Sequence, residues 1–455
     1  MKSWWSVASA LVLSGLLIFA PVRLESRQPT SAEMAARVKA EFRHAWQAYK
    51  QYAWGMDMLR PISRTGRNWH STSLNITPID ALDSLVLLGE REEADATRRF
   101  IVEHTSFDLD ISVKNFEITI RLLGGLLSSY QLTGDSKLLA LADDLGRRLL
   151  PAFESPTGMP YMFVNLKTGQ TREPNTNPAE VGTLLVEFGT LSKLTGKPVY
   201  YDKARKALVE LFKRRSPIGL VGEGINVETG AWTNPDSHVS GAIDSYYEYL
   251  LKASILFDDA ECRRMYDQSL PALNRYLADE VGGALWYGHA DMNTGRRTAA
   301  HYGALDAFFP AVLALGGDVA RARRLQESSH RMWTRFGIEP EEFDYRTMTV
   351  TNAGYPLRPE IIESAYYLFV MTKDPRYQDM GRAYFEALVS RCRYQVGYTA
   401  LSDVVKGTRR DEMDSFFLAE TLKYLYLLFA PPETLDLRAI VFNTEAHPIS
   451  PTWRR

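Results

Sequence analysis

Two kinds of helix are predicted to alternate along the chain. One kind is apolar on nearly every face, and its segments are 116–130, 179–194, 244–256, 304–315 and 358–371. The other kind is amphipathic, with apolar residues on one stripe and charged residues on the opposite side, as at 137–153 and 200–215. A helix that is apolar all round is buried, whereas an amphipathic helix turns one face to solvent. The pattern therefore predicts buried inner helices paired with half-exposed outer helices.

Short polar connectors separate these helices and recur along the chain. They start at residues 87, 132, 194, 256, 314 and 370. This is roughly one connector every 45 to 60 residues, which fits one helical hairpin per repeat. If the opening helix, 35–52, pairs with the closing helix, 415–429, the chain holds about seven hairpins. We expect these hairpins to close into a double ring.

An open solenoid is the alternative arrangement of such hairpins. It would need atypical capping repeats at its ends, yet the last helix, 415–429, is the most apolar of all. The closed ring is therefore favoured, and the predicted fold class is all-α. Loops rich in glycine and aromatic residues at 219–232 and 282–297 predict short β-hairpins at one rim of the ring.

Composition favours one large globular unit. The chain has 455 residues, of which 45% are hydrophobic, and it shows no linker rich in Ser, Pro or Gly. We therefore expect a single barrel domain over 30–448, followed by a tail at 449–455. The formal charge is −2 and no block of Lys and Arg interleaves with aromatic residues. Nucleic acid is not an expected partner.

The N-terminus has the pattern of an export signal. Lys2 precedes an apolar run over 4–20, and Pro21 and Arg23 follow it. Segment 1–25 is thus predicted to be a signal peptide or, because no A-x-A cleavage site follows, an uncleaved signal anchor. Either form exports the protein, to the periplasm or medium in a bacterium and to the endoplasmic reticulum or Golgi lumen in a eukaryote. Membrane association is expected only if this segment is retained.

The two cysteines, Cys262 and Cys392, are far apart in the sequence. Neither belongs to the close Cys/His spacing that zinc sites use, so a zinc enzyme is disfavoured. In an oxidising compartment the two could form a disulfide, but separation in sequence does not give their distance in space. Their pairing is left open.

Acidic residues stand in or near the first turn of almost every predicted inner helix. They are Asp80, Asp83, Glu117, Glu180, Asp244, Glu360, Glu363 and Glu420. Any one of them is explained by the helix dipole or by capping. However, these helices are too apolar to face water, and a buried carboxylate is costly without a partner or a ligand. A ring of such residues predicts a polar cavity. Paired carboxylates with arginines nearby, such as Arg121 and Arg358, are typical of glycoside hydrolysis.

Five segments carry a resemblance to a known family. They read FEITIRLLGGLLSSYQLTGD, SGAIDSYYEYLLK, LRPEIIESAYYLF, SFFLAETLKYLYLLF and VFNTEAHP. In this order they resemble the class I α-mannosidases, glycoside hydrolase family 47, and the resemblance runs from residues 52–61 to His447. It implies an (α/α)7 barrel. It also implies a calcium-dependent, inverting exo-hydrolase that removes terminal α-1,2-linked mannose from oligosaccharides or N-glycans.

The resemblance implies three catalytic carboxylates. Glu117 matches the general acid that protonates the glycosidic oxygen, and Glu360 matches the general base that activates water. Asp244 matches a third catalytic carboxylate. An inverting pair leaves room for water between the sugar and the base, so the two carboxyl groups should lie roughly 6.5 to 9.5 Å apart. Arg121 matches a mannose-contacting arginine, although a salt bridge to Glu117 is an equal alternative that can coexist with it.

The resemblance also implies residues for the metal and the sugar. Thr444 matches the residue that gives Ca²⁺ its carbonyl and hydroxyl oxygens, with water and sugar hydroxyls as the remaining ligands. The residues expected to bind substrate, directly or through water, are Arg121, Glu180, Arg358, Glu363, Glu420 and Glu445. The expected partner is a mannose-containing glycan, and the expected state is a monomer.

The chain also departs from the processing enzymes of the family. Ala304 and Ala307 stand where those enzymes have a histidine and a cysteine, so the family disulfide is missing. Segments 304–315 and 415–429 resemble the EDEM branch, which acts in glycoprotein quality control. The alternative function is therefore a mannose-glycan-binding, quality-control protein with low turnover. A third hypothesis is an inverting enzyme on the same kind of toroid with another sugar specificity, since fold alone does not fix the substrate.

Overall fold

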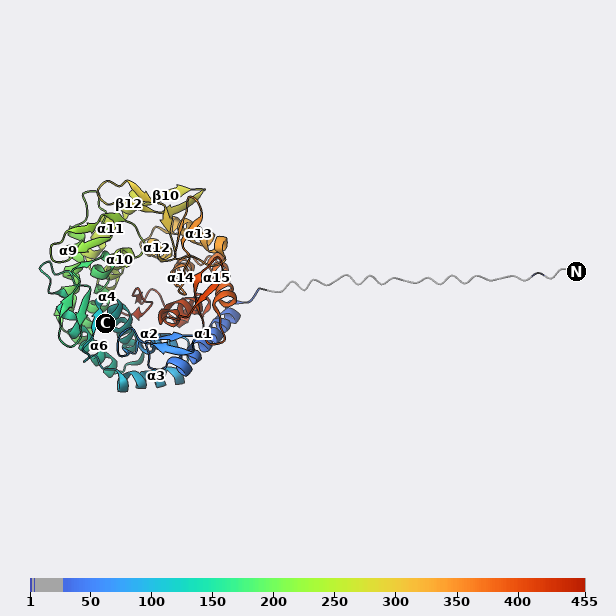
Figure 1. Ribbon diagram of the computed structural model, residues 1–455, viewed down its shortest axis with the longest axis horizontal. Coiled ribbons are helices and arrows are strands. Elements are labelled where there is room, and N and C mark those ends of the chain that lie inside the picture. Colours follow the sequence, from blue (N-terminus) through green and yellow to red (C-terminus); the bar gives the residue numbers. More distant parts are fainter. Residues whose placement is uncertain (2–3, 5–27, 455) are drawn as a thin grey trace.

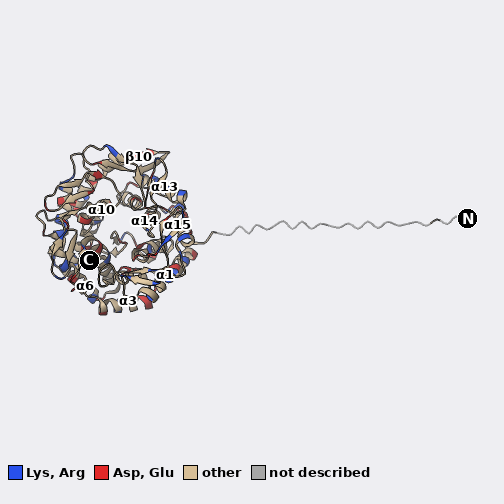
Figure 2. Cartoon of the chain, in the orientation of Figure 1, with Lys and Arg blue, Asp and Glu red and all other residues tan. Residues whose placement is uncertain are grey.

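The helices of the protein are arranged in a ring, as the computed structural model shows (Figure 1). The structure describes residues 1, 4 and 28–454, so the predicted signal peptide or anchor at 1–25 lies almost entirely outside the described residues. Within the described part of the chain, no helix has both the length and the apolar character needed to span a bilayer. Basic and acidic residues are interspersed around the outside of the ring (Figure 2).

Each inner helix packs on the outer helix next to it in sequence. Over the described residues these pairs are α2 (Ile76–Leu87) with α3 (Arg91–His104), α5 (Gly124–Thr133) with α6 (Ser136–Leu149), α8 (Leu185–Thr195) with α9 (Pro198–Lys213), α10 (Asp244–Phe257) with α11 (Ala260–Tyr276), α12 (Phe309–Leu315) with α13 (Val319–Phe336), and α14 (Glu360–Thr372) with α15 (Arg376–Cys392). The first helix, α1 (Ser31–Ala53), packs on the last long one, α16 (Leu422–Phe429). The two ends of the helical array therefore meet.

Burial follows the predicted alternation. In the inner helix α10, residues 245–254 are all buried, whereas the outer helix α6 buries only one stripe, which includes Leu138, Ala142, Leu145 and Leu149. These four residues are spaced three or four apart, which is the period of one helical face. The prediction of mostly helical structure with buried inner and half-exposed outer helices is confirmed.

Several inner helices are broken near their N-terminal ends, where continuous helices were expected. Segment 116–130 is divided into α4 (Asn115–Ile118), a π-helix η1 (Thr119–Leu123) and α5. The next inner helix consists of α7 (Pro178–Gly182) and α8, and the later ones begin with a 3-10 helix η3 (Leu305–Phe308) and a π-helix η4 (Phe417–Thr421). Such π-turns are rare and frequently lie at functional sites.

Short strands connect the helices and confirm the predicted hairpins. The loop at 219–232 contains β7 and the first residue of β8, and these two strands pair. The loop at 282–297 contains β11, β12 and the first residue of β13. Strand β11 pairs with β10, and β12 pairs with β13. The strands are β1 (Met58–Arg60), β2 (Thr65–Arg67), β3 (Ser112–Lys114), β4 (Phe163–Asn165), β5 (Thr171–Arg172), β6 (Asn175–Thr176), β7 (Gly224–Asn226), β8 (Trp232–Asn234), β9 (Asp236–Ser237), β10 (Ala278–Val281), β11 (Ala284–Tyr287), β12 (His289–Asp291), β13 (Arg297–Ala299), β14 (His301–Tyr302), β15 (Glu342–Asp344), β16 (Thr349–Asn352), β17 (Ala400–Asp403), β18 (Thr408–Arg410), β19 (Val441–Phe442) and β20 (Pro448–Ile449).

The last hairpin, β19–β20, packs among the inner helices. The strands pair antiparallel, with β19 against α10 and β20 against α5. Asn443, in the turn between them, donates from Nδ2 to the carbonyl of Ile120 at 2.9 Å and to Glu187 Oε1 at 2.8 Å. A Cβ at Gly124 would lie 2.5 Å from that same Nδ2. Glycine is therefore required there for the hairpin to fit.

The remaining short elements cap the fold. They are two 3-10 turns, η2 (Leu150–Phe153) and η5 (Pro432–Thr434), and a third, η6 (Thr452–Arg454), near the C-terminus. Trp453 stacks on Phe257 with ring centroids 5.7 Å apart. Cys262 and Cys392 are both buried and unpaired, so the disulfide left open above is not formed.

Candidate active site

One cavity of about 290 Å³ is lined by every residue to which the family resemblance assigned a catalytic, metal-binding or substrate-binding role. Those ten residues are Glu117, Arg121, Glu180, Asp244, Arg358, Glu360, Glu363, Glu420, Thr444 and Glu445. A larger cavity of about 970 Å³ has mostly apolar walls and contains none of them. The smaller cavity is the one equipped for acid–base chemistry, since its walls carry paired carboxylates and cationic groups.

The beginnings of the inner helices place the carboxylates. Asp244 and Glu360 are the first residues of α10 and α14, and Glu117 lies in the single turn of α4. Glu180 lies in α7, and Glu420 in the π-helix η4. Carboxylates are favoured at helix N-termini by the helix dipole, so each position is locally stable. Because these ends converge, the carboxylates share one cavity.

Arg121 joins two carboxylates at the cavity wall. Its Nε and Nη2 donate to Glu117 Oε2 at 3.2 and 3.1 Å, and its Nη1 donates to Glu445. The guanidinium also lies over the rings of Trp69 and Phe416, 5.5 and 5.6 Å from their centroids. The salt bridge to Glu117 that the sequence left as an alternative is therefore present, and Arg121 lines the cavity as well.

Glu360 is a buried carboxylate with one unpartnered oxygen. Burial raises its pKa to about 7, although Arg358, 3.9 Å away, pulls it down. Its Oε2 has no hydrogen-bond partner among the described residues. Arg358 is itself held by Glu341, through hydrogen bonds of 2.9 and 3.0 Å. A carboxylate that lines a cavity, with a pKa near neutrality and an oxygen without a partner, is suited to accept a proton from water.

Two further carboxylates have raised pKa values for the same reason. Burial raises the pKa of Asp244 to about 7, against a 2.8 Å hydrogen bond from the backbone N–H of Ser245. Burial also raises the pKa of Glu180 to about 7, even though Lys114 Nζ lies 2.6 Å from its carboxylate. The cavity therefore holds acids whose protonation changes near neutral pH.

Oxygen atoms dominate the part of the cavity around Thr444. The Thr444 hydroxyl donates to Glu248 Oε2 at 3.0 Å, and Tyr424 donates to Glu363 Oε1 at 3.2 Å. Burial raises the pKa of Glu363 to about 8, against the opposing charge of Lys252 Nζ, 3.9 Å away. Burial raises the pKa of Glu420 well above its usual range, and like charges on neighbouring carboxylates add to both effects. Crowded, buried carboxylates with hydroxyl neighbours are the donors that a hard cation such as Ca²⁺ prefers.

The structure corrects the prediction for Asp80 and Asp83. Both lie beyond the first turn of α2, are fully buried and do not line the cavity. His447 contacts both carboxylates, at 3.0 Å from Asp80 and 2.7 Å from Asp83, and Lys423 lies 2.7 Å from Asp83. Burial opposes ionisation, but the charges of Lys423 and His447 outweigh it and lower the pKa of Asp83 to about 2. These two acids hold the C-terminal segment.

Some cavity residues were not found from the sequence. Glu248 lies one turn after Asp244 on the same helix, and that i,i+4 spacing was the available signal. Lys114, which pairs with Glu180, comes from β3 and had no local signal. Phe116, Phe308 and Phe416 add aromatic faces of the kind that can stack on a sugar ring.

The chain is similar to known proteins over nearly its whole described length. The family model described as glycosyl hydrolase family 47 matches residues 41–451. Alpha-mannosidase I MNS4 of Arabidopsis thaliana is 38% identical, over 98% of this chain and 75% of that protein. Mannosyl-oligosaccharide 1,2-alpha-mannosidase IB of Mus musculus is 38% identical, over 91% and 69% respectively. The solved alpha-1,2-mannosidase from Trichoderma reesei superposes with a TM-score of 0.85 at 29% identity, covering 92% of this chain and 98% of that one.

Proposed function

Because the chain belongs to glycosyl hydrolase family 47, we propose that it removes terminal α-1,2-linked mannose from oligosaccharides or N-glycans. It is a glycosidase, similar over nearly its whole length to proteins named as α-1,2-mannosidases. The observation that carries the proposal is the convergence of all ten assigned residues on one cavity. The ring of helix pairs, with α1 packed on α16, supports an (α/α)7 barrel as the scaffold.

The catalytic roles follow from the surroundings of each carboxylate. Glu117 is the general acid, and Arg121 orients it through two hydrogen bonds. Glu360 is the general base, because its pKa of about 7 and its unpartnered oxygen allow it to take a proton from water. Asp244 is the third catalytic carboxylate. Water attacks the anomeric carbon as the glycosidic oxygen is protonated, so the configuration inverts and no covalent intermediate forms.

The remaining charged residues of the cavity bind the sugar. Arg121 and Arg358 present guanidinium N–H groups at its wall, and Glu180, Glu363, Glu420 and Glu445 present carboxylate oxygens. Sugar hydroxyls can donate to carboxylates and accept from guanidinium groups. These residues therefore fix the orientation of the terminal mannose relative to Glu117 and Glu360.

The donor set around Thr444 fits Ca²⁺. Thr444 would hold the ion through its oxygens, while Glu363, Glu420 and Glu445 would hold the ion's water ligands. When bound, Ca²⁺ supplies positive charge that anchors sugar hydroxyls and offsets the crowded carboxylates. The buried, like-charged surroundings of Glu420 support such a cation.

Hydrolysis is favoured over glycan binding without turnover. The acid, the base and the third carboxylate are all present and line the same cavity. Hydrolysis needs an acid and a base in one cavity, whereas glycan binding alone does not. We further propose that the protein acts as an exported monomer on mannose-containing glycans.

One assay tests this function. The full chain is incubated with an α-1,2-linked mannobiose, with and without a calcium chelator, and the released mannose is followed by NMR. We expect β-mannose to appear first and its release to stop with the chelator. Binding without release would show a glycan-binding protein instead. Early α-mannose would exclude inversion, and release that continues in chelator would exclude the role of calcium.

A further inference from the structure

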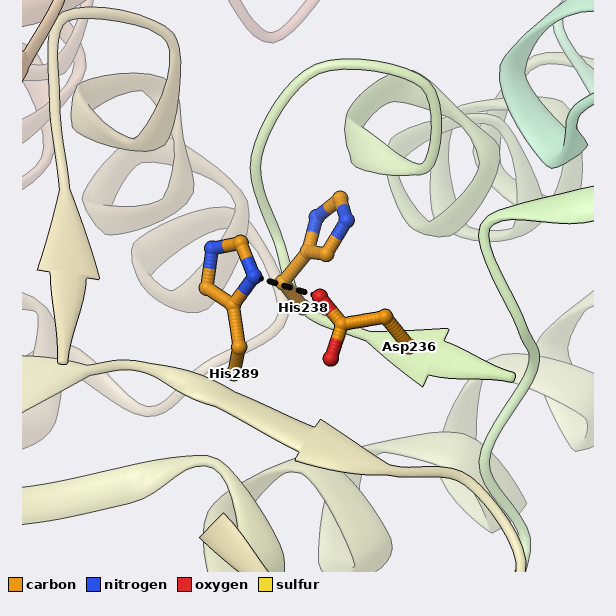
Figure 3. A group of neighbouring side chains, drawn as sticks. All are labelled: Asp236, His238 and His289. Atoms are coloured by element: carbon orange, nitrogen blue, oxygen red, sulfur yellow. Dashed lines mark hydrogen bonds and ion pairs between the residues drawn. The ribbon is translucent and has the colours of Figure 1, made fainter. Parts of the chain in front are cut away.

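A second group of potential metal ligands lies outside the ten residues described above and does not line their cavity. Asp236, His238 and His289 each bring a ligand atom, and these atoms all lie within 4.8 Å of one another. Figure 3 shows the three side chains turned toward one another. Among the described residues this is the one group of three His, Cys, Asp or Glu side chains that meets this distance.

Paired strands bring the three residues together. Asp236 lies on β9, His238 follows that strand directly, and His289 lies on β12. Strands β9 and β12 are antiparallel neighbours, with Ala290 opposite Ser237. The backbone hydrogen bonds of this sheet fix the distance between the two segments. The cluster is therefore a product of the fold rather than of flexible surface side chains.

His238 has an unused nitrogen in this cluster. The residue is 3% exposed, and its Nδ1 has no hydrogen-bond partner among the described residues. Its ring stacks on that of His289, with centroids 4.3 Å apart, while His289 Nδ1 lies 2.7 Å from Asp236 Oδ2. A buried polar nitrogen without a partner is costly and uncommon in native proteins. A ligand that accepts the imidazole lone pair would remove that cost.

We propose that Asp236, His238 and His289 bind a divalent transition-metal ion of the Zn²⁺ type, at a site separate from the calcium site.

The chemistry of the ligands selects this class of metal. Two imidazole nitrogens and one carboxylate oxygen form a common ligand set for zinc, which takes four ligands. Calcium instead takes about 6 to 8 oxygen ligands and has little use for imidazole. Zinc bonds of about 2.0 to 2.2 Å place neighbouring ligand atoms about 3.3 Å apart. Small side-chain movements would bring the cluster to that spacing.

The surroundings also suit a bound cation. The Oε2 of Glu223 lies 3.6 Å from His238 Nε2, where it can orient the imidazole while Nδ1 binds the ion. Water would then be the fourth ligand. The bound ion would link β12 to the segment that leads to Asp244. Ser240 lies two residues after His238 in that segment, and its carbonyl accepts a hydrogen bond from the Asp244 N–H at 2.9 Å.

Zinc binding to the full chain tests this site independently of hydrolysis. Metal-free protein is first saturated with excess Ca²⁺ and then titrated with Zn²⁺ by calorimetry. We expect one Zn²⁺ per chain, retained in the presence of calcium. In His289→Asn and Asp236→Asn, affinity should fall by more than about 100-fold, since loss of an outer-shell partner alone costs about 10- to 100-fold. The matched control is His104→Asn, an exposed histidine on α3.

A second measurement keeps the test valid if a variant folds poorly. Zn²⁺ should raise the unfolding temperature of the calcium-loaded wild type and of His104→Asn, but not that of His289→Asn or Asp236→Asn. Three results would overturn the proposal: wild-type protein that binds no zinc, zinc that calcium displaces, or variants that bind zinc as tightly as the wild type. Mannose release could be intact in all three cases, so failure of this site is distinguishable from failure of the proposed function.

Discussion

Arg121 holds Glu117 from one helical turn away, through hydrogen bonds of 3.2 and 3.1 Å to a single carboxylate oxygen. A π-helix that includes Arg121 begins two residues after Glu117. The same guanidinium reaches Glu445 in the turn of the last hairpin. One side chain therefore sets the position of the proposed acid relative to the C-terminal segment.

Replacing Arg121 by lysine tests this relationship. Lysine keeps the charge but loses the planar fork that serves two carboxylates at once. We expect kcat/KM to fall by about 10- to 100-fold, because hydrogen bonds to charged groups contribute about 1.5 to 3 kcal/mol each. Steady-state kinetics on the mannobiose measure the change. An unchanged kcat/KM would show that Arg121 neither orients the acid nor binds the sugar.

Removing the ionisable group of either proposed acid–base residue should stop turnover while preserving binding. Glu117→Gln and Glu360→Gln keep side-chain size but cannot transfer a proton, so kcat should fall by at least about 100-fold. Calorimetry with mannobiose should show affinity close to that of the wild type. Glu433→Gln, at an exposed position, is the control. A wild-type rate in either active-site variant would exclude that residue from its role.

The pH dependence should show an acid limb near pH 7. Burial raises the pKa of Glu360 and of Asp244 to about 7. Because a base acts in its ionised form, kcat/KM should decline as pH falls below about 7, by about tenfold per unit for one group. Arg358 favours ionisation of Glu360, so Arg358→Gln should move the limb to higher pH. Profiles between about pH 5 and 8 check this, and a limb that moves to lower pH would contradict it.

Thr444 should control calcium affinity. Thr444→Val removes the hydroxyl that donates to Glu248 while preserving side-chain volume. We expect calcium affinity to fall by about 10- to 100-fold, the usual effect of disturbing a metal site. Calcium titration of metal-free protein measures it, with Thr434→Val, outside the cavity, as the control. Equal affinity in the two variants would place the ion elsewhere.

The buried network around Asp83 should matter for stability rather than for chemistry. Asp83→Asn leaves the positive charge of Lys423 buried beside a neutral amide. Removing one partner of a buried ion pair costs about 3 to 5 kcal/mol. Urea unfolding measures the free energy, and the exposed pair Arg37–Glu386, at 40% and 54% side-chain exposure, offers Glu386→Gln as a control. A loss below about 1 kcal/mol, the value of a surface pair, would contradict the prediction.

The periodic features of the fold were predictable from the sequence. The spacing of apolar residues predicts which helices are inner and which are outer, because a helix that is apolar on all faces is buried and a helix that is apolar on one face is half-exposed. Local interruptions were not predictable. The π-helix at Thr119–Leu123 and the division between α7 and α8 lie in segments whose sequence still has the pattern of a continuous helix.

Individual site residues could be predicted only where a sequence motif pointed to them. Asp244 and Glu360 begin strongly apolar helices, and Thr444 was identified through the resemblance of its segment alone. Asp80 and Asp83 appeared equivalent to them, yet they pair with His447 and Lys423, which lie more than 300 residues away. Only tertiary structure distinguishes an acid that faces a cavity from one that faces a buried cation.

The hairpin at residues 441–449 is synthesised after the helices of the ring, and this affects when the cavity can form. Residues 441–449 follow every helix of the ring, yet they supply Thr444 and Glu445 to the cavity and place Asn443 against the backbone of Ile120. Synthesis runs from the N-terminus, and earlier parts of a chain fold first. A nascent chain thus contains the proposed acid and base, Glu117 and Glu360, before it contains Thr444 and Glu445. We therefore expect hydrolysis to begin only after residues 441–449 have been added and have docked.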